Sequence, residues 1–229
     1  MDAHREAILD KVSLSRPPIT AVLDCGNGAG SVITPPDILA AAGGATVIGL
    51  NCNVMGRFSR PSEPLEANLP YIGEIVRRRG GAACAVIHDG DADRMMAFDE
   101  RGRYIDGDHL LMLFAKYLDR KRVVTTVDAS MAIEEVAEVR RTPVGDSFVS
   151  EELLSWGGTS AARRRGGAGS FPRHSYCPDG IYAAALLCEI ASEWSIAEEL
   201  DRMPRYTLLR ESYRINAPRE VMGGRWGGR

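Results

Sequence analysis

Three aspartates alternate with small residues in the segment HDGDADR, which covers residues 88–94. This segment directly follows the apolar run AACAVI, whose pattern predicts a buried β-strand. Three carboxylates on one tight loop repel one another unless a cation lies among them, and hard oxygen ligands favour Mg²⁺. We therefore predict that Asp89, Asp91 and Asp93 bind Mg²⁺. Arg94 would present its planar guanidinium to a phosphate or carboxylate beside the metal.

Other interpretations of this segment can be compared with its residues. An EF-hand calcium loop is excluded, because Arg94 stands where that loop needs glycine for its sharp turn. A phosphatase of the haloacid dehalogenase type would use Asp89 as its nucleophile, but it expects Thr or Val at the position of Asp93. That alternative stays open, as does a solvated acidic turn that closes a hairpin.

The glycine-rich segment DCGNGAG, residues 24–30, follows the first apolar run of the chain. Its G-x-G-x-G spacing differs from the G-x-G-x-x-G of dinucleotide-binding proteins, and no acidic residue ends the next predicted strand. We expect a tight turn from a strand into a helix, in which Asp24 and Asn27 bind backbone groups. This turn would also help to shape the neighbouring site.

Two further segments precede predicted helices in the second half of the chain. RTPVGD, residues 141–146, places Gly145 and Asp146 where helix capping and anion-facing amides are expected. In CPDG, residues 177–180, Asp179 lies at the start of the last long helix and complements its dipole. Taken alone, both segments are explained as helix starts.

Apolar runs rich in Val and Ile alternate with stretches of helical period, which predicts α/β layers. The predicted strands cover 19–25, 45–50, 83–88, 95–98, 103–105, 122–127 and 139–143. The predicted helices cover 31–42, 66–79, 108–118, 131–138, 147–155 and 180–193. We expect two consecutive α/β domains, each a small mixed sheet flanked by helices, over residues 1–106 and 107–217. The Gly- and Arg-rich stretch 156–170 is predicted to be a mobile loop, and residues 218–229 a disordered tail.

The composition is that of an ordinary globular chain. With 28 basic and 31 acidic residues, the net charge of -3 provides no overall attraction to nucleic acid or to an anionic membrane. No stretch approaches the roughly 20 apolar residues that span a bilayer, and the start MDAHREAILDKVSL lacks the apolar region of a secretory signal. We expect a cytoplasmic protein whose five cysteines are reduced thiols, without disulfide or zinc framework.

Taken in order, DCGNGAG, the proline-containing polar stretch, DGDADR, RTPVGD and CPDG resemble the α-D-phosphohexomutase superfamily. The resemblance is to the archaeal-type branch of phosphomannomutase, phosphoglucomutase and phosphoglucosamine mutase, and it covers residues 19–212. It extends to the middle two of the family's four domains. It implies a Mg²⁺-dependent transfer of a phosphoryl group from an active-site phosphoserine to a hexose phosphate, through a hexose bisphosphate.

The resemblance also implies roles for individual residues. The three aspartates would be the Mg²⁺ ligands, and Arg94 resembles the catalytic arginine that contacts the reacting phosphate. A substrate-proximal turn and the start of a sugar-binding loop would provide the substrate-binding residues, which are Thr142, Gly145, Asp146, Gly157 and Gly158.

The sequence departs from the family pattern in its sugar-binding loop. The family pattern GGE-x-SG, whose Glu and Ser bind sugar hydroxyls, is replaced after Gly158 by TSAARRRGGAGS, up to Phe171. We hypothesise a local frameshift over residues 159–170, and the same origin for the C-terminal REVMGGRWGGR. The phosphoserine domain and the C-terminal phosphate-binding domain of the family have no counterpart in the sequence.

The leading hypothesis is therefore a phosphohexomutase fragment whose own turnover is negligible. A hexose phosphate would be its ligand, and a separate chain could supply the missing domains. Two alternatives stay open: a non-catalytic module that binds a sugar phosphate or assembles with another chain, and a Mg²⁺-dependent phosphatase. The residues do not indicate which hexose phosphate is bound.

Overall fold

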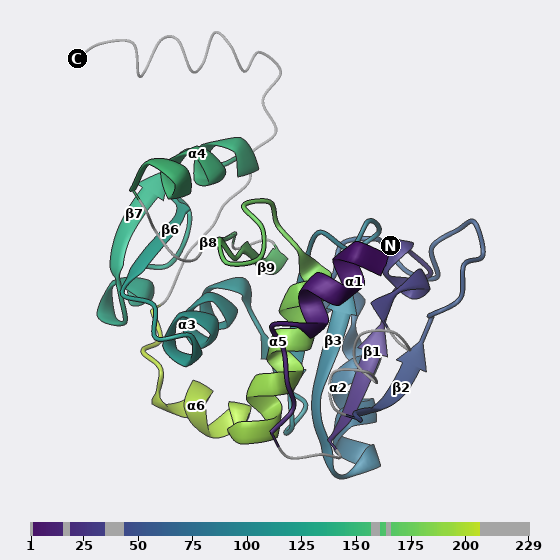
Figure 1. Cartoon of the computed structure of the whole chain (residues 1–229). Helices are drawn as coiled ribbons and strands as arrows, with labels where there is room; N and C mark the ends of the chain where they lie inside the picture. Colours follow the sequence, from purple (N-terminus) through teal and green to yellow (C-terminus); the bar gives the residue numbers. More distant parts are fainter. Residues whose placement is uncertain (1, 16–18, 35–43, 157–160, 164–165, 207–229) are drawn as a thin grey trace, which may run out of the picture.

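The computed structural model describes residues 2–15, 19–34, 44–156, 161–163 and 166–206 (Figure 1). In the first half, the elements are α1 (Asp2–Leu9), β1 (Thr20–Asp24), the 3₁₀ helix η1 (Ala29–Val32), β2 (Thr46–Leu50), the 3₁₀ helix η3 (Glu66–Asn68), α2 (Pro70–Arg79), β3 (Ala82–His88), β4 (Met95–Asp99) and β5 (Tyr104–Ile105). In the second half, they are α3 (Gly107–Tyr117), β6 (Arg122–Thr126), the 3₁₀ helix η4 (Met131–Glu135), β7 (Glu138–Thr142), α4 (Asp146–Trp156), β8 (Ala161–Arg163), β9 (Gly166–Ser170), α5 (Gly180–Glu193) and α6 (Ile196–Arg202). The predicted α/β class is confirmed.

The first half builds a five-stranded mixed sheet of order β2-β1-β3-β4-β5. Strand β1 is parallel to β2 and β3, whereas β4 is antiparallel to β3 and β5. Strand β3 has the pattern of a strand covered on both faces, since six of its seven residues are buried. The loop between β3 and β4 therefore begins at a rigid, buried strand end.

The second half builds a four-stranded sheet of order β7-β6-β8-β9. Strand β6 is parallel to β7 and β8, and β9 is antiparallel to β8. Among the described residues, β6 pairs with β8 through Val124 and Ala161.

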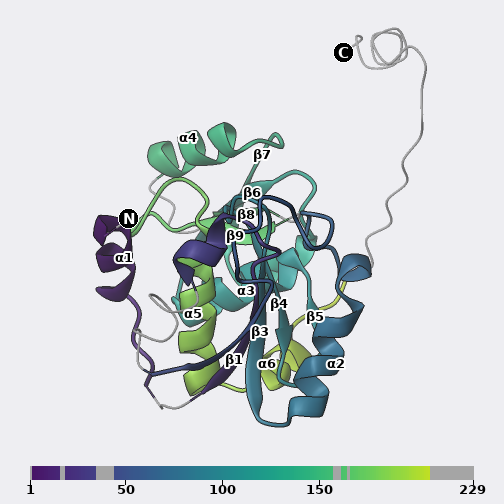
Figure 2. The ribbon, with the colours of Figure 1, turned by 90° about the vertical axis from the view of Figure 1, so that its right-hand side faces the viewer.

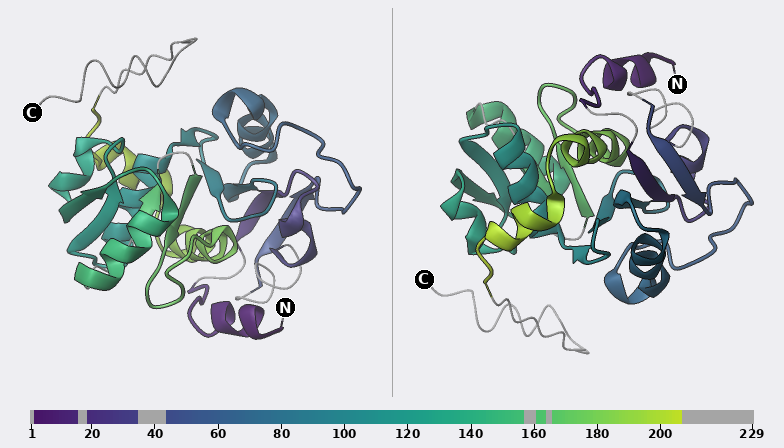
Figure 3. Two further views of the ribbon diagram at one scale, coloured as in Figure 1. Left: turned by 90° about the horizontal axis from the view of Figure 1, so that it is seen from above. Right: turned by 90° about the horizontal axis from the view of Figure 1, so that it is seen from below.

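Helices cover both faces of the first sheet (Figure 2). Alternate residues of β1 and β3 point to opposite faces, so Val22 and Ile87 pack with α2, whereas Leu23 and Val86 belong to the cluster that contains α5. Seen from above and from below, α5 lies between the two halves (Figure 3). This larger cluster also includes Phe114 of α3, so both halves contribute to one buried core. The predicted domain boundary at Asp106 falls between β5 and α3 and stays a prediction.

Two expectations need correction. The stretch 156–170, predicted as a loop, contains β8 and β9, because ladder pairing to neighbouring strands orders residues that have no strand preference of their own. The helix predicted over 131–138 is a 3₁₀ helix that ends at Glu135, and β7 begins at Glu138. The helix predicted over 31–42 stays a prediction: the structure has a 3₁₀ helix at Ala29–Val32, and residues 35–43 lie outside the described part of the chain.

Some segments were not predicted or are not described. Helices α1 and α6 were missed because they are short and carry mixed charges. The predicted tail 218–229 lies outside the described residues. In the part of the chain that is described, no helix has the length and apolar character needed to cross a bilayer.

Candidate functional site

The loop between β3 and β4, residues 89–94, brings the three predicted aspartates together; we call it the aspartate loop. One carboxylate oxygen each of Asp89, Asp91 and Asp93 lies within 4.8 Å of the other two. Asp89 is buried, Asp93 is half-buried and Asp91 is exposed, so the cluster opens toward solvent on one side. Oxygen ligands with this spacing and one open side suit a hard divalent cation that keeps some of its water.

Arg94 lies against the carboxylates of its own loop. Its Nε donates to Asp89 Oδ2 at 2.6 Å and its backbone N–H donates to Asp89 Oδ1 at 3.2 Å. The same Nε is 3.4 Å from Asp93 Oδ1, and Nη1 is 3.7 Å from Glu63 Oε1. Both oxygens of the buried Asp89 are thus engaged, which disfavours Asp89 as a free nucleophile and with it the phosphatase interpretation.

Asp93 shows that the aspartate loop carries an excess of negative charge. Burial, together with the charges of Asp89 and Asp91, raises the pKa of Asp93 to about 6, although Arg94 opposes the shift. Its Oδ1 is buried and has no hydrogen-bond donor among the described residues. A cation placed among the three carboxylates would satisfy this oxygen and lower the pKa of Asp93.

Two glycines hold the backbone of the aspartate loop from opposite sides. On one side, the N–H of Ala29 donates to the carbonyl of Gly90 at 2.9 Å, and a Cβ at Gly28 would lie 2.5 Å from that carbonyl oxygen. On the other side, the N–H of Gly180 donates to the carbonyl of Ala92 at 3.2 Å, and a Cβ at Gly180 would lie 2.7 Å from it. The DCGNGAG turn thus contacts the loop directly, as predicted, and α5 of the second half holds its other side.

A buried ion pair supports the strand ends below the loop. Asp24 at the end of β1 accepts from Arg60 Nε at 3.2 Å, and the two side chains are 0% and 5% exposed. Asp24 also accepts from Tyr71 Oη at 2.7 Å and from Asn51 Nδ2 at 2.9 Å. Arg60 Nη2 donates to the carbonyl of His88 at 2.6 Å, which links β1 to the last residue of β3.

His88 lies under the aspartate loop as an uncharged ring. Burial lowers its pKa to about 4, and both ring nitrogens lack hydrogen-bond partners among the described residues. A Cβ at Gly30 would lie 2.9 Å from its Cδ2, so the glycine turn packs directly on the imidazole. The ring therefore acts as an apolar filler at this position.

Two family models match the chain almost from end to end. The model described as phosphoglucomutase/phosphomannomutase, alpha/beta/alpha domain II, matches residues 2–102, and that of domain III matches residues 106–206. The chain belongs to the phosphoglucomutase/phosphomannomutase family. The predicted resemblance is confirmed, and its two family-model matches are arranged in the predicted order.

Relatives and solved structures agree with this assignment. A probable phosphoglucosamine mutase of Methanocella arvoryzae is 39% identical over 95% of this chain and 52% of its own length, and one of Pyrococcus furiosus is 39% identical over 88% and 46%. A phosphoglucomutase/phosphomannomutase family protein of Burkholderia thailandensis superposes with a TM-score of 0.80 at 25% identity, over 90% of this chain and 47% of that one. The chain spans about half the length of the curated relatives that it matches.

One of the structural neighbours was solved with bound ligands. The N-acetylphosphoglucosamine mutase of Aspergillus fumigatus, solved with GlcNAc-6P and magnesium, superposes with a TM-score of 0.57 at 16% identity, over 88% of this chain and 48% of that one. At this identity the likeness shows a shared fold.

The other predicted site residues lie in the second half of the chain. Thr142 is buried at the end of β7, and its hydroxyl donates to the carbonyl of Pro143 at 3.0 Å. Gly145 has a φ of 156° and precedes Asp146, the first residue of α4. The structure thus places these residues at a strand-to-helix turn, as predicted, on a different sheet from the carboxylates. Gly157 and Gly158 lie outside the described residues.

Sequence reasoning missed the residues that support the aspartate loop from a distance. Arg60 lies in a polar stretch between β2 and α2, where a single arginine gives no signal of burial. The sequence correctly places Gly180 at the start of a helix. Its contact with Ala92 could not be predicted in this way, because it joins residues far apart in the chain. Covariation between such positions is the signal that could have found them.

Proposed function

We propose that this chain is the magnesium-binding part of a phosphohexomutase, an isomerase that moves a phosphoryl group between two positions of a hexose phosphate. The observation that carries the proposal is the aspartate loop, in which three carboxylates and Arg94 converge at a strand end. This loop lies in a chain that matches both central domains of the family, and its curated relatives are named phosphoglucosamine mutases.

Asp89, Asp91 and Asp93 are the proposed Mg²⁺ ligands. The fit rests on the close spacing of their oxygens, on the buried Oδ1 of Asp93, which accepts no hydrogen bond from the described residues, and on the raised pKa of that carboxyl group. When bound, the ion would neutralise charge on the oxygens of a transferring phosphoryl group. The protein would contribute a preorganised loop, held by Gly28 on one side and Gly180 on the other.

Arg94 is proposed to contact the reacting phosphate. Its Nε is bound to Asp89, and its side chain is 25% exposed, so it is partly accessible to a ligand. A planar cation fixed beside a metal site stabilises phosphoryl charge without reorganising during the reaction. The ion pair with Asp89 would keep the orientation of this guanidinium constant.

The proposed substrate is a hexosamine phosphate, because the curated relatives are named phosphoglucosamine mutases. Thr142, Gly145 and Asp146 are proposed to bind it from the second sheet, at the turn between β7 and α4. Gly157 and Gly158 complete the proposed set of substrate-binding residues. Turnover is proposed to need the domains that make up the other half of the relatives' length, on the same or a separate polypeptide.

Titration calorimetry with Mg²⁺ tests the metal assignment directly. Asp91→Asn removes one exposed carboxylate without changing the size of the side chain, and we expect Mg²⁺ affinity to fall at least tenfold. Asp119→Asn is the matched control, because Asp119 is exposed, lies outside the aspartate loop and has a left-handed backbone that asparagine tolerates. Equal Mg²⁺ affinity for the wild type and Asp91→Asn would refute the assignment.

A ligand titration tests the substrate class. In the presence of Mg²⁺, we expect glucosamine 6-phosphate to bind more tightly than mannose 6-phosphate or inorganic phosphate. Asp146→Asn should weaken hexosamine phosphate binding while leaving Mg²⁺ affinity unchanged, since Asp146 begins α4 and lies outside the aspartate loop. Binding of inorganic phosphate as tight as that of the sugar phosphates would limit the proposal to a phosphate site.

A further inference from the structure

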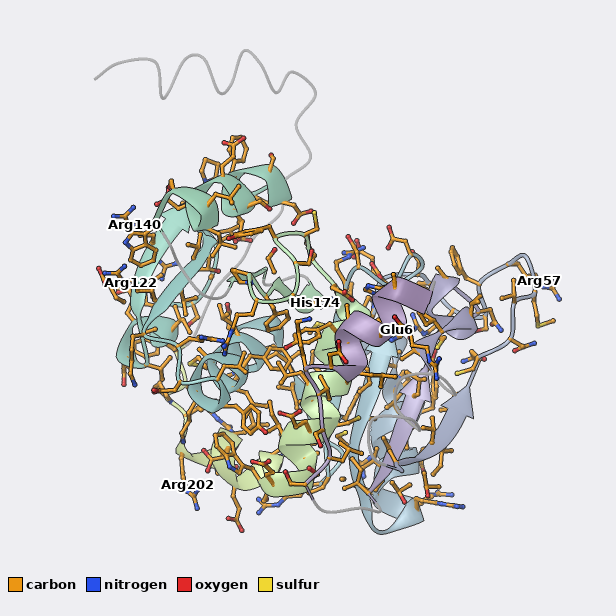
Figure 4. All side chains as sticks on the ribbon, in the orientation of Figure 1. Glu6, Arg57, Arg122, Arg140, His174 and Arg202 are labelled. Carbon is orange, nitrogen blue, oxygen red and sulfur yellow. The ribbon has the colours of Figure 1, made fainter. Side chains whose placement is uncertain are left out.

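A second cluster of metal-ligating side chains lies where three distant segments meet. His4 belongs to α1, His174 follows the strand β9, and Asp179 precedes α5. One ligand atom of each residue lies within 4.8 Å of the other two. Figure 4 shows His174 near the centre of the molecule, beside α1 and α5. The fold therefore brings together a cluster that no sequence motif predicts.

We propose that His4, His174 and Asp179 form a second cation site, which takes a transition-metal ion of the zinc class. Two imidazoles and one carboxylate suit zinc, cobalt or nickel, whereas an all-oxygen set such as the aspartate loop suits magnesium. The two sites would thus be selective for different ions in one chain. The inference does not depend on the proposed mutase function.

The spacing of the ligand atoms fits this assignment. Nε2 of His4 lies 3.4 Å from Asp179 Oδ2, and Nε2 of His174 lies 2.7 Å from the same oxygen. Ligand atoms around a tetrahedral zinc ion with bonds of about 2.0 to 2.1 Å are separated by roughly 3.3 Å. The distance between His4 and Asp179 already matches, and His174 needs an outward movement of about half an ångström.

Asp179 divides its two oxygens between two tasks. Oδ1 accepts from the backbone N–H groups of Ile181 at 3.0 Å and Tyr182 at 2.9 Å, and so caps α5. Oδ2 faces the histidines. Burial opposes ionisation, but the hydrogen bonds from His174 and from the Tyr182 N–H hold the pKa of Asp179 below its usual range. The helix cap thus fixes a carboxylate whose second oxygen is oriented for an ion.

The two histidines differ in a way that suits a binding site with an entrance. The His174 side chain is 4% exposed, and its ring stacks on Tyr182 with centroids 4.4 Å apart. The His4 side chain is 40% exposed, on a helix at the surface. An ion would thus be held by one buried and one partly exposed imidazole, and water could complete its coordination from the side of His4.

The position of this cluster gives an ion a structural consequence. Gly180, the residue after Asp179, donates to the carbonyl of Ala92 in the aspartate loop. An ion held by Asp179 and His4 would tie α1 to the beginning of α5, one residue away from this contact. Occupancy of the second site should therefore stiffen the backbone on which the aspartate loop rests.

Cobalt is the probe of choice, because four- or five-coordinate Co²⁺ with nitrogen ligands absorbs visible light far more strongly than six-coordinate Co²⁺ with oxygen ligands. The full chain is titrated with Co²⁺ at saturating Mg²⁺, which fills the aspartate loop. We expect an intense visible band that Zn²⁺ abolishes by competition. Absence of the band, together with absence of Zn²⁺ binding by calorimetry, would reduce the cluster to a hydrogen-bonded pair of His174 and Asp179.

Three variants assign the band to the cluster. His4→Ala removes an exposed ligand from the surface, and Asp179→Asn keeps an oxygen for the helix cap while replacing the second oxygen with an amide. Each should weaken Co²⁺ and Zn²⁺ binding at least tenfold. Asp91→Asn is the control and should change these affinities by less than twofold.

The opposite pattern would overturn the proposal. If the cobalt band is lost in Asp91→Asn and retained in His4→Ala, the ion occupies the aspartate loop. Circular dichroism of each variant establishes that it is folded. His4 is partly exposed on a helix at the surface, so its replacement decides the matter even if Asp179→Asn impairs folding.

Discussion

The two sheets of this protein repeat one plan and use it differently. In the order β2-β1-β3-β4 and in the order β7-β6-β8-β9, a central strand is parallel to two neighbours, and the last strand is antiparallel. Along the chain, a 3₁₀ helix follows β1 in the first half and β6 in the second half. An α-helix precedes β3 in the first half and β8 in the second half. The proposed Mg²⁺ ligands lie on the loop between β3 and β4 of the first sheet.

The difference lies in what surrounds the aspartate loop. Strand β3 pairs with β1 at five positions, and its following loop is held by contacts from residue 29 and residue 180. In the described part of the second sheet, β8 pairs with β6 through Ala161 and Val124. A shared strand order therefore does not determine where a charged site forms. Burial of the strand end and backbone contacts from both sides allow three carboxylates to be held close together.

The ion pairs of the two sheets differ in the same sense. The Arg60–Asp24 pair below the aspartate loop is almost fully buried. Arg140 of β7 and Glu152 of α4 form a pair whose side chains are 51% and 29% exposed. Figure 4 shows Arg140 on the outer side of the second sheet. Since a buried charge left without its partner is costly and an exposed one is not, the two pairs should respond very differently to mutation.

The largest effect is expected for Arg60→Met. It leaves the carboxylate of Asp24 buried without its guanidinium and removes the donor to the carbonyl of His88, so we expect the free energy of unfolding to fall by about 3 to 5 kcal/mol. Arg140→Met is the matched control, with an expected loss of at most about 1 kcal/mol. Urea unfolding of both variants measures the difference. Similar losses would contradict the contrast between the two sheets.

The next effect concerns pH and the histidine under the aspartate loop. Burial lowers the pKa of His88 to about 4 from its ordinary 6.5, so an unfolded chain takes up the proton first and stability falls as the pH drops from 6.5 toward 4. This difference corresponds to roughly 3 kcal/mol. Unfolding of the metal-free protein at several pH values should show the slope. His88→Leu should flatten it, whereas His109→Gln, which replaces a histidine of α3, should retain it.

Much of the fold was predictable because apolar runs and glycines mark its elements. Helix α5 has the predicted bounds Gly180–Glu193, and each predicted strand coincides with an observed one within a residue or two. These elements are decided by local pattern and by burial, which the sequence records directly. The cluster of carboxylates was predictable for the same reason, since its three members lie on one loop.

What could not be predicted depends on contacts between distant segments. Strands β8 and β9 consist largely of Ala, Gly and Arg, and they are ordered by pairing with neighbours and not by their own preference. The burial of Arg60 follows from its contact with Asp24, 36 residues away. His4 meets Asp179 only because α1 packs beside α5.

A smaller effect is expected at the contact between the two halves. Gly180→Ala would place a Cβ 2.7 Å from the carbonyl oxygen of Ala92, so the start of α5 must move away from the aspartate loop. We expect a loss of about 2 kcal/mol in stability and several-fold weaker Mg²⁺ binding. Gly49→Ala is the control, because a Cβ there meets the side chain of Cys52 at 3.3 Å, on the outermost strand β2. Unchanged Mg²⁺ affinity in Gly180→Ala would show that the second half does not support the loop.

The smallest effect is expected at α3, the helix that begins the second half. Asp106 caps this helix by accepting from the backbone N–H of His109 at 2.9 Å, in the way that Asp179 caps α5. Asp106→Ala should cost about 1 kcal/mol, and Asp106→Asn should restore most of it. Because the observed helix-end contact with the aspartate loop is made by α5, we expect Mg²⁺ affinity in Asp106→Ala to equal that of the wild type. Weakened Mg²⁺ binding in this variant would mean that the loop responds to general destabilisation, and the effect of Gly180→Ala would lose its specific explanation.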